Sequence, residues 1–172
     1  MTDKLRSAGV SVPAIGADTE ARIATMLPPL TYLKNPVDTG RPLESFGAVC
    51  ATLSEDPAID ALLVYALHES DVVDFADAVG SAASQSGKQC IFGTQGRRQD
   101  VAPMKKALAK QGVALIASPD RAANAMKALV EDARGRRRML ETASFEPDTT
   151  ELPEPPALPN DLAEASAKEF IG

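Results

Sequence analysis

His68 is the only histidine in the 172-residue chain, and it directly follows an apolar run with the composition of a buried strand. An imidazole can carry a phosphoryl group or move a proton near neutral pH. Open α/β sheets bind ligands beyond the carboxyl ends of their strands, which is where His68 is expected to lie. His68 is therefore a weak catalytic candidate. It can also be read as a group that lines a site near an interface, or as a solvated loop residue, and the last interpretation is favoured.

Other polar loops and two thiols complete the set of residues that could do chemistry. Asp38 follows Asn-Pro-Val in a loop, where an aspartate more often bonds its own backbone than acts as a catalytic acid. The loop at residues 94–98 holds two arginines that could meet an anionic group, although a plain polar loop is favoured. Cys50 and Cys90 lie within apolar patterns, which predicts reduced core thiols. We find no Walker-type loop, zinc-ligand spacing or GxSxG elbow, and we predict no metal site.

The elements that must position these residues alternate along the chain. Periodic apolar residues predict a series of helices. The first ends at Gly9, the second begins near Asp18, the third follows Pro42, the fourth is capped by Ser70, the fifth ends at Gly112 and the sixth begins at Ser118. Short apolar runs predict strands at residues 10–15, 59–67, 89–93 and 113–117, the first demoted to an edge by Pro13. Such alternation predicts right-handed crossovers and an open, mostly parallel sheet flanked by helices, a flavodoxin-like α/β fold. Because Met1 stands at or inside a helix, the pattern leaves open whether the first strand is missing.

Charge is unevenly distributed along the chain. Residues 1–140 hold 17 basic and 16 acidic side chains, whereas residues 141–172 hold one basic and eight acidic ones. We therefore predict a folded domain over residues 1–140, a linker rich in proline and acids over residues 141–160, and the start of a following segment over residues 161–172. An arginine run at residues 134–138 is expected at a helix end. Without a basic face, an apolar run of ~20 residues or a signal peptide, we expect no nucleic-acid partner, no membrane partner and a cytoplasmic location.

Two motifs carry a resemblance to a known family. The sequence NPVD at residues 35–38, followed by a helix and then EDPAIDALLVYAL at residues 55–67, resembles the ligase-type CoA domain of NDP-forming acyl-CoA synthetases. These are ADP-forming acetate–CoA ligases and similar enzymes, related to succinyl-CoA synthetase. The chain is most similar to their second flavodoxin-like domain over residues 1–140. The closing LAEASAKEFIG resembles the opening helix of their ATP-grasp segment.

The resemblance implies an activity for a larger protein. ATP phosphorylates a histidine in another domain, the phosphoryl group passes to a carboxylic acid, and CoA attacks the acyl phosphate to give the thioester. ATP with Mg²⁺ and CoA would be substrates of that parent enzyme, and none is expected to bind this chain alone. The implied partners are CoA-binding and phosphohistidine domains upstream and an ATP-grasp domain downstream, in the same chain or a separate subunit. The isolated chain would be an inactive part of an acid–thiol ligase.

Within this chain the resemblance implies two helix ends that face the phosphohistidine, since helix amino-termini attract anions. The first would involve Asn35, Asp38, Thr39 and Gly40, and the second Glu69 and Ser70. The second loop departs from the family, because His-Glu-Ser-Asp at residues 68–71 replaces a glycine-rich turn and brings two acids toward the anion.

A different class of function is a non-catalytic regulatory or ligand-binding module of the same fold. A receiver domain is disfavoured because no aspartate stands alone after the middle strand. A flavin carrier is disfavoured further, since no phosphate loop follows a first strand and tryptophan is absent. The interpretation as a degenerate, catalytically silent relative of the synthetases also stays open.

Overall fold

A computed structural model of the chain describes residues 1–40, 44–68 and 73–143. Two compact units are present, Met1–Arg137 and Arg138–Gly172, and the described part of the second is the end of one helix. The helices are α1 (Thr2–Ser7), α2 (Ala17–Ala24), α3 (Phe46–Glu55), α4 (Phe75–Ser86), α5 (Arg98–Lys110) and α6 (Pro119–Ala143). The strands are β1 (Ala61–Tyr65), β2 (Gln89–Gly93) and β3 (Ala114–Ile116).

The three strands form one parallel sheet in the order β1-β2-β3. Ala61 pairs with Gln89 and Tyr65 with Gly93, while Ile91 pairs with Ala114. Each strand is followed by a helix, as parallel neighbours require. The predicted open, parallel α/β sheet flanked by helices is confirmed, and β2 has the bounds expected from the sequence.

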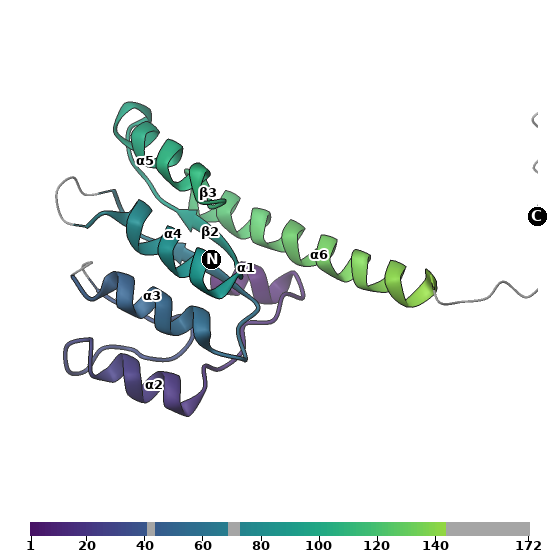
Figure 1. The fold of residues 1–172 in the computed structure, drawn as a ribbon, viewed down its shortest axis with the longest axis horizontal. Coiled ribbons are helices and arrows are strands. Elements are labelled where there is room, and N and C mark those ends of the chain that lie inside the picture. Colours follow the sequence, from purple (N-terminus) through teal and green to yellow (C-terminus); the bar gives the residue numbers. More distant parts are fainter. Residues whose placement is uncertain (41–43, 69–72, 144–172) are drawn as a thin grey trace, which may run out of the picture. The chain divides into compact units, whose positions relative to one another are not determined.

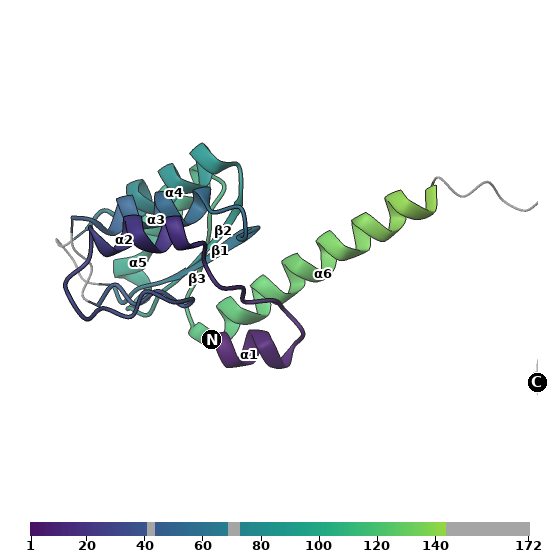
Figure 2. The same ribbon diagram turned by 90° about the horizontal axis from the view of Figure 1, so that it is seen from below.

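Helices cover both faces of the sheet (Figure 2). On one face α2, α3, α4 and α5 pack side by side in that order (Figure 1). A large apolar cluster fills the space beneath them, with Ile23, Val79 and Leu108 fully buried. On the other face α1 and the beginning of α6 enclose a smaller cluster that includes Leu5 and Met126.

Three phenylalanine rings form the centre of the larger cluster. The rings of Phe46 and Phe75 meet edge to face with centroids 5.3 Å apart, and Phe75 lies 5.3 Å from Phe92. Phe92 is completely buried in β2. These contacts join α3, α4 and the middle strand, which fixes the amino-terminal ends of both helices over the sheet.

The predicted strand at residues 10–15 is wrong, because the structure has no strand before β1 in its described residues. Val10 and Ile15 are buried, although they belong to no helix or strand. Pro13 has no N–H to donate, and its carbonyl accepts a hydrogen bond from the Asn35 side chain at 2.8 Å. The segment therefore packs through its side chains without joining the sheet.

α2 begins at Ala17, close to the start predicted near Asp18, and the N–H of its N-cap residue Gly16 is bonded to the carboxylate of Asp56. Two other predicted helix limits are wrong. α4 begins at Phe75 with Asp74 as its cap, and the predicted cap Ser70 lies outside the described residues. α6 continues to Ala143, so the arginine run at residues 134–138 lies inside a helix rather than at its end. The predicted linker and following segment fall mostly outside the described residues.

Candidate functional site

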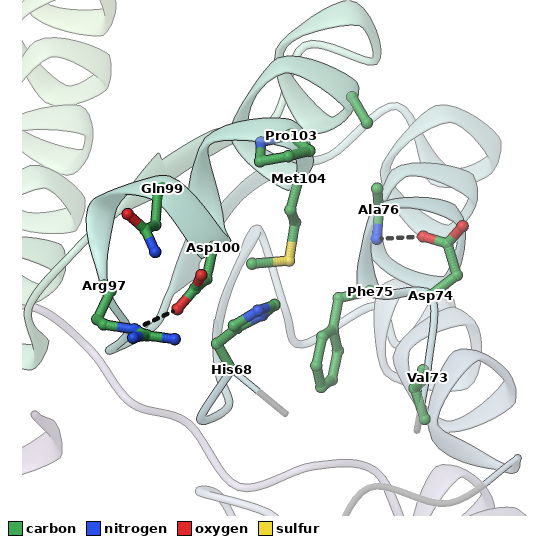
Figure 3. A pocket seen from close by; sticks show the side chains of 11 residues that line it. His68, Val73, Asp74, Phe75, Ala76, Arg97, Gln99, Asp100, Pro103 and Met104 are labelled. Carbon is green, nitrogen blue, oxygen red and sulfur yellow. Dashed lines mark hydrogen bonds and ion pairs between the residues drawn. The ribbon is translucent and has the colours of Figure 1, made fainter. Parts of the chain in front are cut away.

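A hollow of about 720 Å³ opens between the amino-terminal ends of α4 and α5, and we call it the His68 hollow (Figure 3). Val73, Phe75, Met104 and other apolar side chains form one wall. The polar lining is His68, Asp74, Arg97, Gln99 and Asp100. Because both helices follow strands of a parallel sheet, the hollow lies where α/β sheets commonly bind ligands.

His68 lines this hollow. Its backbone N–H donates to the carbonyl of Gln95 at 3.2 Å, which ties the chain after β1 to the chain after β2. A side chain on Gly96 would come within 3.1 Å of the His68 Cβ, so glycine leaves room for the imidazole. The Nδ1 atom is buried and has no hydrogen-bond partner among the described residues. A buried nitrogen cannot be reached by a phosphoryl donor, so the geometry does not favour Nδ1 as a phosphoryl carrier.

The amino-terminal end of α4 is already occupied by a carboxylate of the same chain, that of Asp74. Asp74 is the N-cap residue, and its Oδ1 accepts hydrogen bonds from the N–H groups of Ala76 and Asp77, each at 3.0 Å. These N–H groups are the ones that an external phosphate would use at a helix amino-terminus. Phosphate could bind there only by displacing Asp74.

The amino-terminal end of α5 also carries an acidic residue. Asp100 stands in its first turn and accepts a hydrogen bond from Nε of Arg97 at 2.8 Å. Because this ion pair is exposed, it contributes no more than ~1 kcal/mol, but it occupies the guanidinium that faces the hollow. The charged lining is thus two carboxylates and one paired arginine, an arrangement that does not attract phosphate.

Replacing Asp74 with alanine is expected to lower the free energy of unfolding by about 1 kcal/mol, because two helix N–H groups lose their cap. Urea denaturation followed by circular dichroism measures the change. The matched control is Asp77→Ala, an exposed acid in the same turn, for which we expect a change within about 0.5 kcal/mol. Equal effects for both variants would contradict the capping role.

The other predicted loop borders a separate hollow of about 440 Å³, which Asp38, Thr39 and Gly40 line together with residues 28 and 30–32. Asp38 accepts a hydrogen bond from the N–H of Gly40 at 2.8 Å, the turn expected for this residue. Gly40 has a φ of 61°, which glycine adopts without strain. The amide of Asn35 is used by its bond to Pro13, and the Asn35–Pro36 peptide is cis.

The predicted site residues are therefore not brought together in one hollow. His68 lines the first hollow, while Asp38, Thr39 and Gly40 line the second. Glu69, Ser70 and Asp71 lie outside the described residues. The sequence did not single out Asp74, although an aspartate three residues before Asp77 is a usable helix-start signal.

Asp56 is a structural residue that the sequence analysis also missed. Its buried carboxylate accepts hydrogen bonds from the N–H groups of Gly16 at 2.7 Å and Ala58 at 2.8 Å. A hydrogen bond from the Thr19 side chain is the main cause that lowers the pKa of Asp56, and the two N–H groups and the charge of Lys88 add to it against the effect of burial. Asp56 thereby joins the start of α2 to the approach to β1.

The two cysteines are free and buried. Burial raises the pKa of both the Cys50 and Cys90 thiols to about 12, and the neighbouring Cys90 adds to the shift at Cys50. Both are protonated at neutral pH, which suits core residues and not nucleophiles.

No described helix has the length and apolar character needed to cross a membrane. No three histidine, cysteine or acidic side chains gather there in a way that could hold a metal ion.

No known family model matches this sequence, and neither does any curated protein. Among solved structures, the chain is similar to the crystal structure of PH0766 from Pyrococcus horikoshii OT3, with a TM-score of 0.68 and 24% sequence identity. The matched region covers 77% of this chain and 32% of the PH0766 chain, so the chain corresponds to about a third of that protein's length. This similarity shows the fold: the chain is an α/β domain with a parallel sheet flanked by helices, of flavodoxin-like type.

Proposed function

We propose that the chain works as a CoA-ligase-type domain of an NDP-forming acyl-CoA synthetase, as one module of a larger assembly. The observation that carries the proposal is where the two family-like motifs lie. NPVD forms a fixed turn before α3, and the Asp56 of EDPAID clamps the approach to β1. Both motifs thus bond to the segment between α1 and α2, at Pro13 and Gly16, in a fold that is shared with one part of a longer protein.

In this proposal the chain contributes surface and helix ends rather than a reactive group. The phosphorylated histidine, ATP with Mg²⁺ and CoA belong to partner domains, namely the CoA-binding, phosphohistidine and ATP-grasp domains. The described residues fit none of these groups well, since both helix ends at the His68 hollow carry acids and no metal-binding cluster is found among them. The overall reaction would join a carboxylic acid and CoA at the expense of ATP, through a phosphohistidine and an acyl phosphate.

One observation favours a second candidate, a non-catalytic relative that serves regulation or ligand binding. In a working synthetase domain the end of α4 would be free to face phosphohistidine, whereas here Asp74 occupies it. A degenerate domain of the same fold would keep the architecture and lose this anion site.

Labelling with γ-³²P-ATP tests both candidates. The chain is incubated alone and then with the CoA-binding, phosphohistidine and ATP-grasp domains of its parent protein, and these domains are also incubated without the chain. We expect acid-labile label only in the mixture, on a histidine outside this chain, and its release when carboxylic acid and CoA are added. The control variant His68→Ala should label equally well in the mixture.

Two other outcomes would change the conclusion. Label on His68 in the isolated chain would overturn the proposal and make the protein a phosphocarrier. Labelling of the partner domains that does not depend on this chain would favour the non-catalytic candidate.

A further inference from the structure

β1 is an edge strand with the sequence of a central one. It lies at one end of the sheet and pairs only with β2 among the described residues. Its five residues, ALLVY, include no charged residue, proline or glycine. Natural edge strands are commonly short, or carry charges or proline that prevent pairing with other chains. The opposite edge is protected in this way, because β3 has only three residues. The edge of β1 is not.

The apolar side chains of β1 are incompletely covered. Only Leu62 is buried, and the other residues of the strand are partly exposed. In β2, which has a strand on each side, every residue after Gln89 is buried. Helices cover both faces of the sheet (Figure 2), so the difference between the two strands lies in the free edge of β1.

The free edge presents backbone groups at alternate residues. The N–H groups of Ala66 and His68, just after β1, donate to carbonyls at the end of β2 and just beyond it, at 3.1 and 3.2 Å. Even-numbered residues of this stretch therefore point toward β2. Because backbone groups alternate in direction along a strand, the N–H and C=O groups of Leu63 and Tyr65 point away from β2. These groups have no hydrogen-bond partner among the described residues.

Apolar layers continue beyond this edge on both faces of the sheet. α3 packs on β1, and α2 packs on the outer side of α3, so the row of helices reaches past the last strand (Figure 1). On the other face, the segment before α2 brings Val10 and Val12 to the apolar cluster that Leu63 also joins. A strand added beside β1 would therefore lie between two covered faces, as the inner strands of parallel sheets do.

We propose that the free edge of β1 binds one extended apolar strand of a partner polypeptide. The main-chain groups of Leu63 and Tyr65 would bond this strand, in the manner of β-strand addition at other exposed sheet edges. The side chains of the added strand would be uncharged, because the clusters on both faces are apolar and a charge buried there would be costly. The inference does not depend on the proposed function, since it follows from the sheet and its helices alone.

A second copy of the chain does not fit this edge. Neighbouring strands lie about 4.8 Å apart, whereas a helix with its side chains is about 10 Å wide. Two copies joined through β1 would each place α2 over the strands of the other, on a face that is already covered. A single strand needs only the width of a strand and avoids this overlap.

Hydrogen exchange of the full chain, followed residue by residue by NMR, tests whether the edge is free. We expect the amides of Leu63 and Tyr65 to exchange at least tenfold faster than those of Leu62 and Val64, which point toward β2. The two pairs alternate in one strand, so each pair is the control for the other.

A tethered strand tests the occupant. The probe is the peptide Val-Thr-Val-Ile-Val-Thr-Val, joined to Met1 of the full chain by a Gly/Ser linker of about 20 residues, which spans roughly 25 Å. We expect the probe to slow exchange at Leu63 and Tyr65 at least tenfold and to raise the melting temperature by about 5 °C. The matched control has proline at the three central positions of the probe. Proline cannot donate to a ladder, so both values should stay as in the original chain.

Three results would overturn the inference. Equally slow exchange of all four amides in the original chain would mean that the edge is already covered. If analytical ultracentrifugation then shows a dimer, the cover is a second copy. Equal effects of the probe and its proline control, including no effect of either, would show that the edge does not accept a strand.

Discussion

Phe92→Ala is expected to lower the free energy of unfolding by about 4 kcal/mol. The Phe92 ring is fully buried in the middle strand and lies 5.3 Å from Phe75, which in turn contacts Phe46. Its removal would leave a cavity at the meeting point of α3, α4 and β2. Domains are stable by only about 5–15 kcal/mol, so this single change would bring the chain close to unfolding at room temperature.

Urea denaturation at 25 °C, followed by circular dichroism, measures this loss. Tyr32→Ala is a suitable control, because it removes an aromatic ring that is 58% exposed and should change the free energy of unfolding by about 0.5 kcal/mol or less. A loss below about 1 kcal/mol for Phe92→Ala would mean that the three rings do not form the centre of the core.

Asp56→Ala is expected to cost about 3 kcal/mol of stability. The variant would leave the partly buried N–H groups of Gly16 and Ala58 without their acceptor, together with the hydroxyl of Thr19. Asp60→Ala, at an exposed acid four residues further along, is the matched control and should stay within about 0.5 kcal/mol. Similar losses for the two variants would show that Asp56 is not the clamp between α2 and β1.

The contribution of Asp56 should depend on pH in a defined direction. Its pKa is lower in the folded chain than in the unfolded one, so the ionised carboxylate stabilises the fold above the unfolded pKa of about 4. This stability is lost as the pH falls below about 4 and through the folded pKa. Denaturation curves of the original chain and Asp56→Asn should therefore differ by a constant amount near pH 7 and converge in acid. A difference that persists unchanged at low pH would contradict the assignment.

Local sequence rules were sufficient for most elements of the fold. Alternating apolar runs and amphipathic stretches predicted the parallel sheet, and β2 was placed at residues 89–93 as observed. Gly9 and Gly112 were expected to end helices, and each has a positive φ that glycine adopts freely. The Asp38 turn was also predictable, because an aspartate can bond the backbone N–H two residues later without contacts from the remainder of the chain.

Contacts between distant residues decided what the sequence could not. The N–H of Gly16 at the start of α2 is bonded to Asp56, 40 residues away, and the segment at residues 10–15 is joined to a distant loop by a bond from Asn35 to Pro13. The candidate site shows the same limit. The sequence placed His68 after a strand, but only the packing of α4 and α5 around it buries Nδ1 and sets Asp74 and Asp100 at the helix ends. Periodicity and turn preferences act over a few residues, whereas the charge and access of a site depend on side chains that meet only when the layers pack.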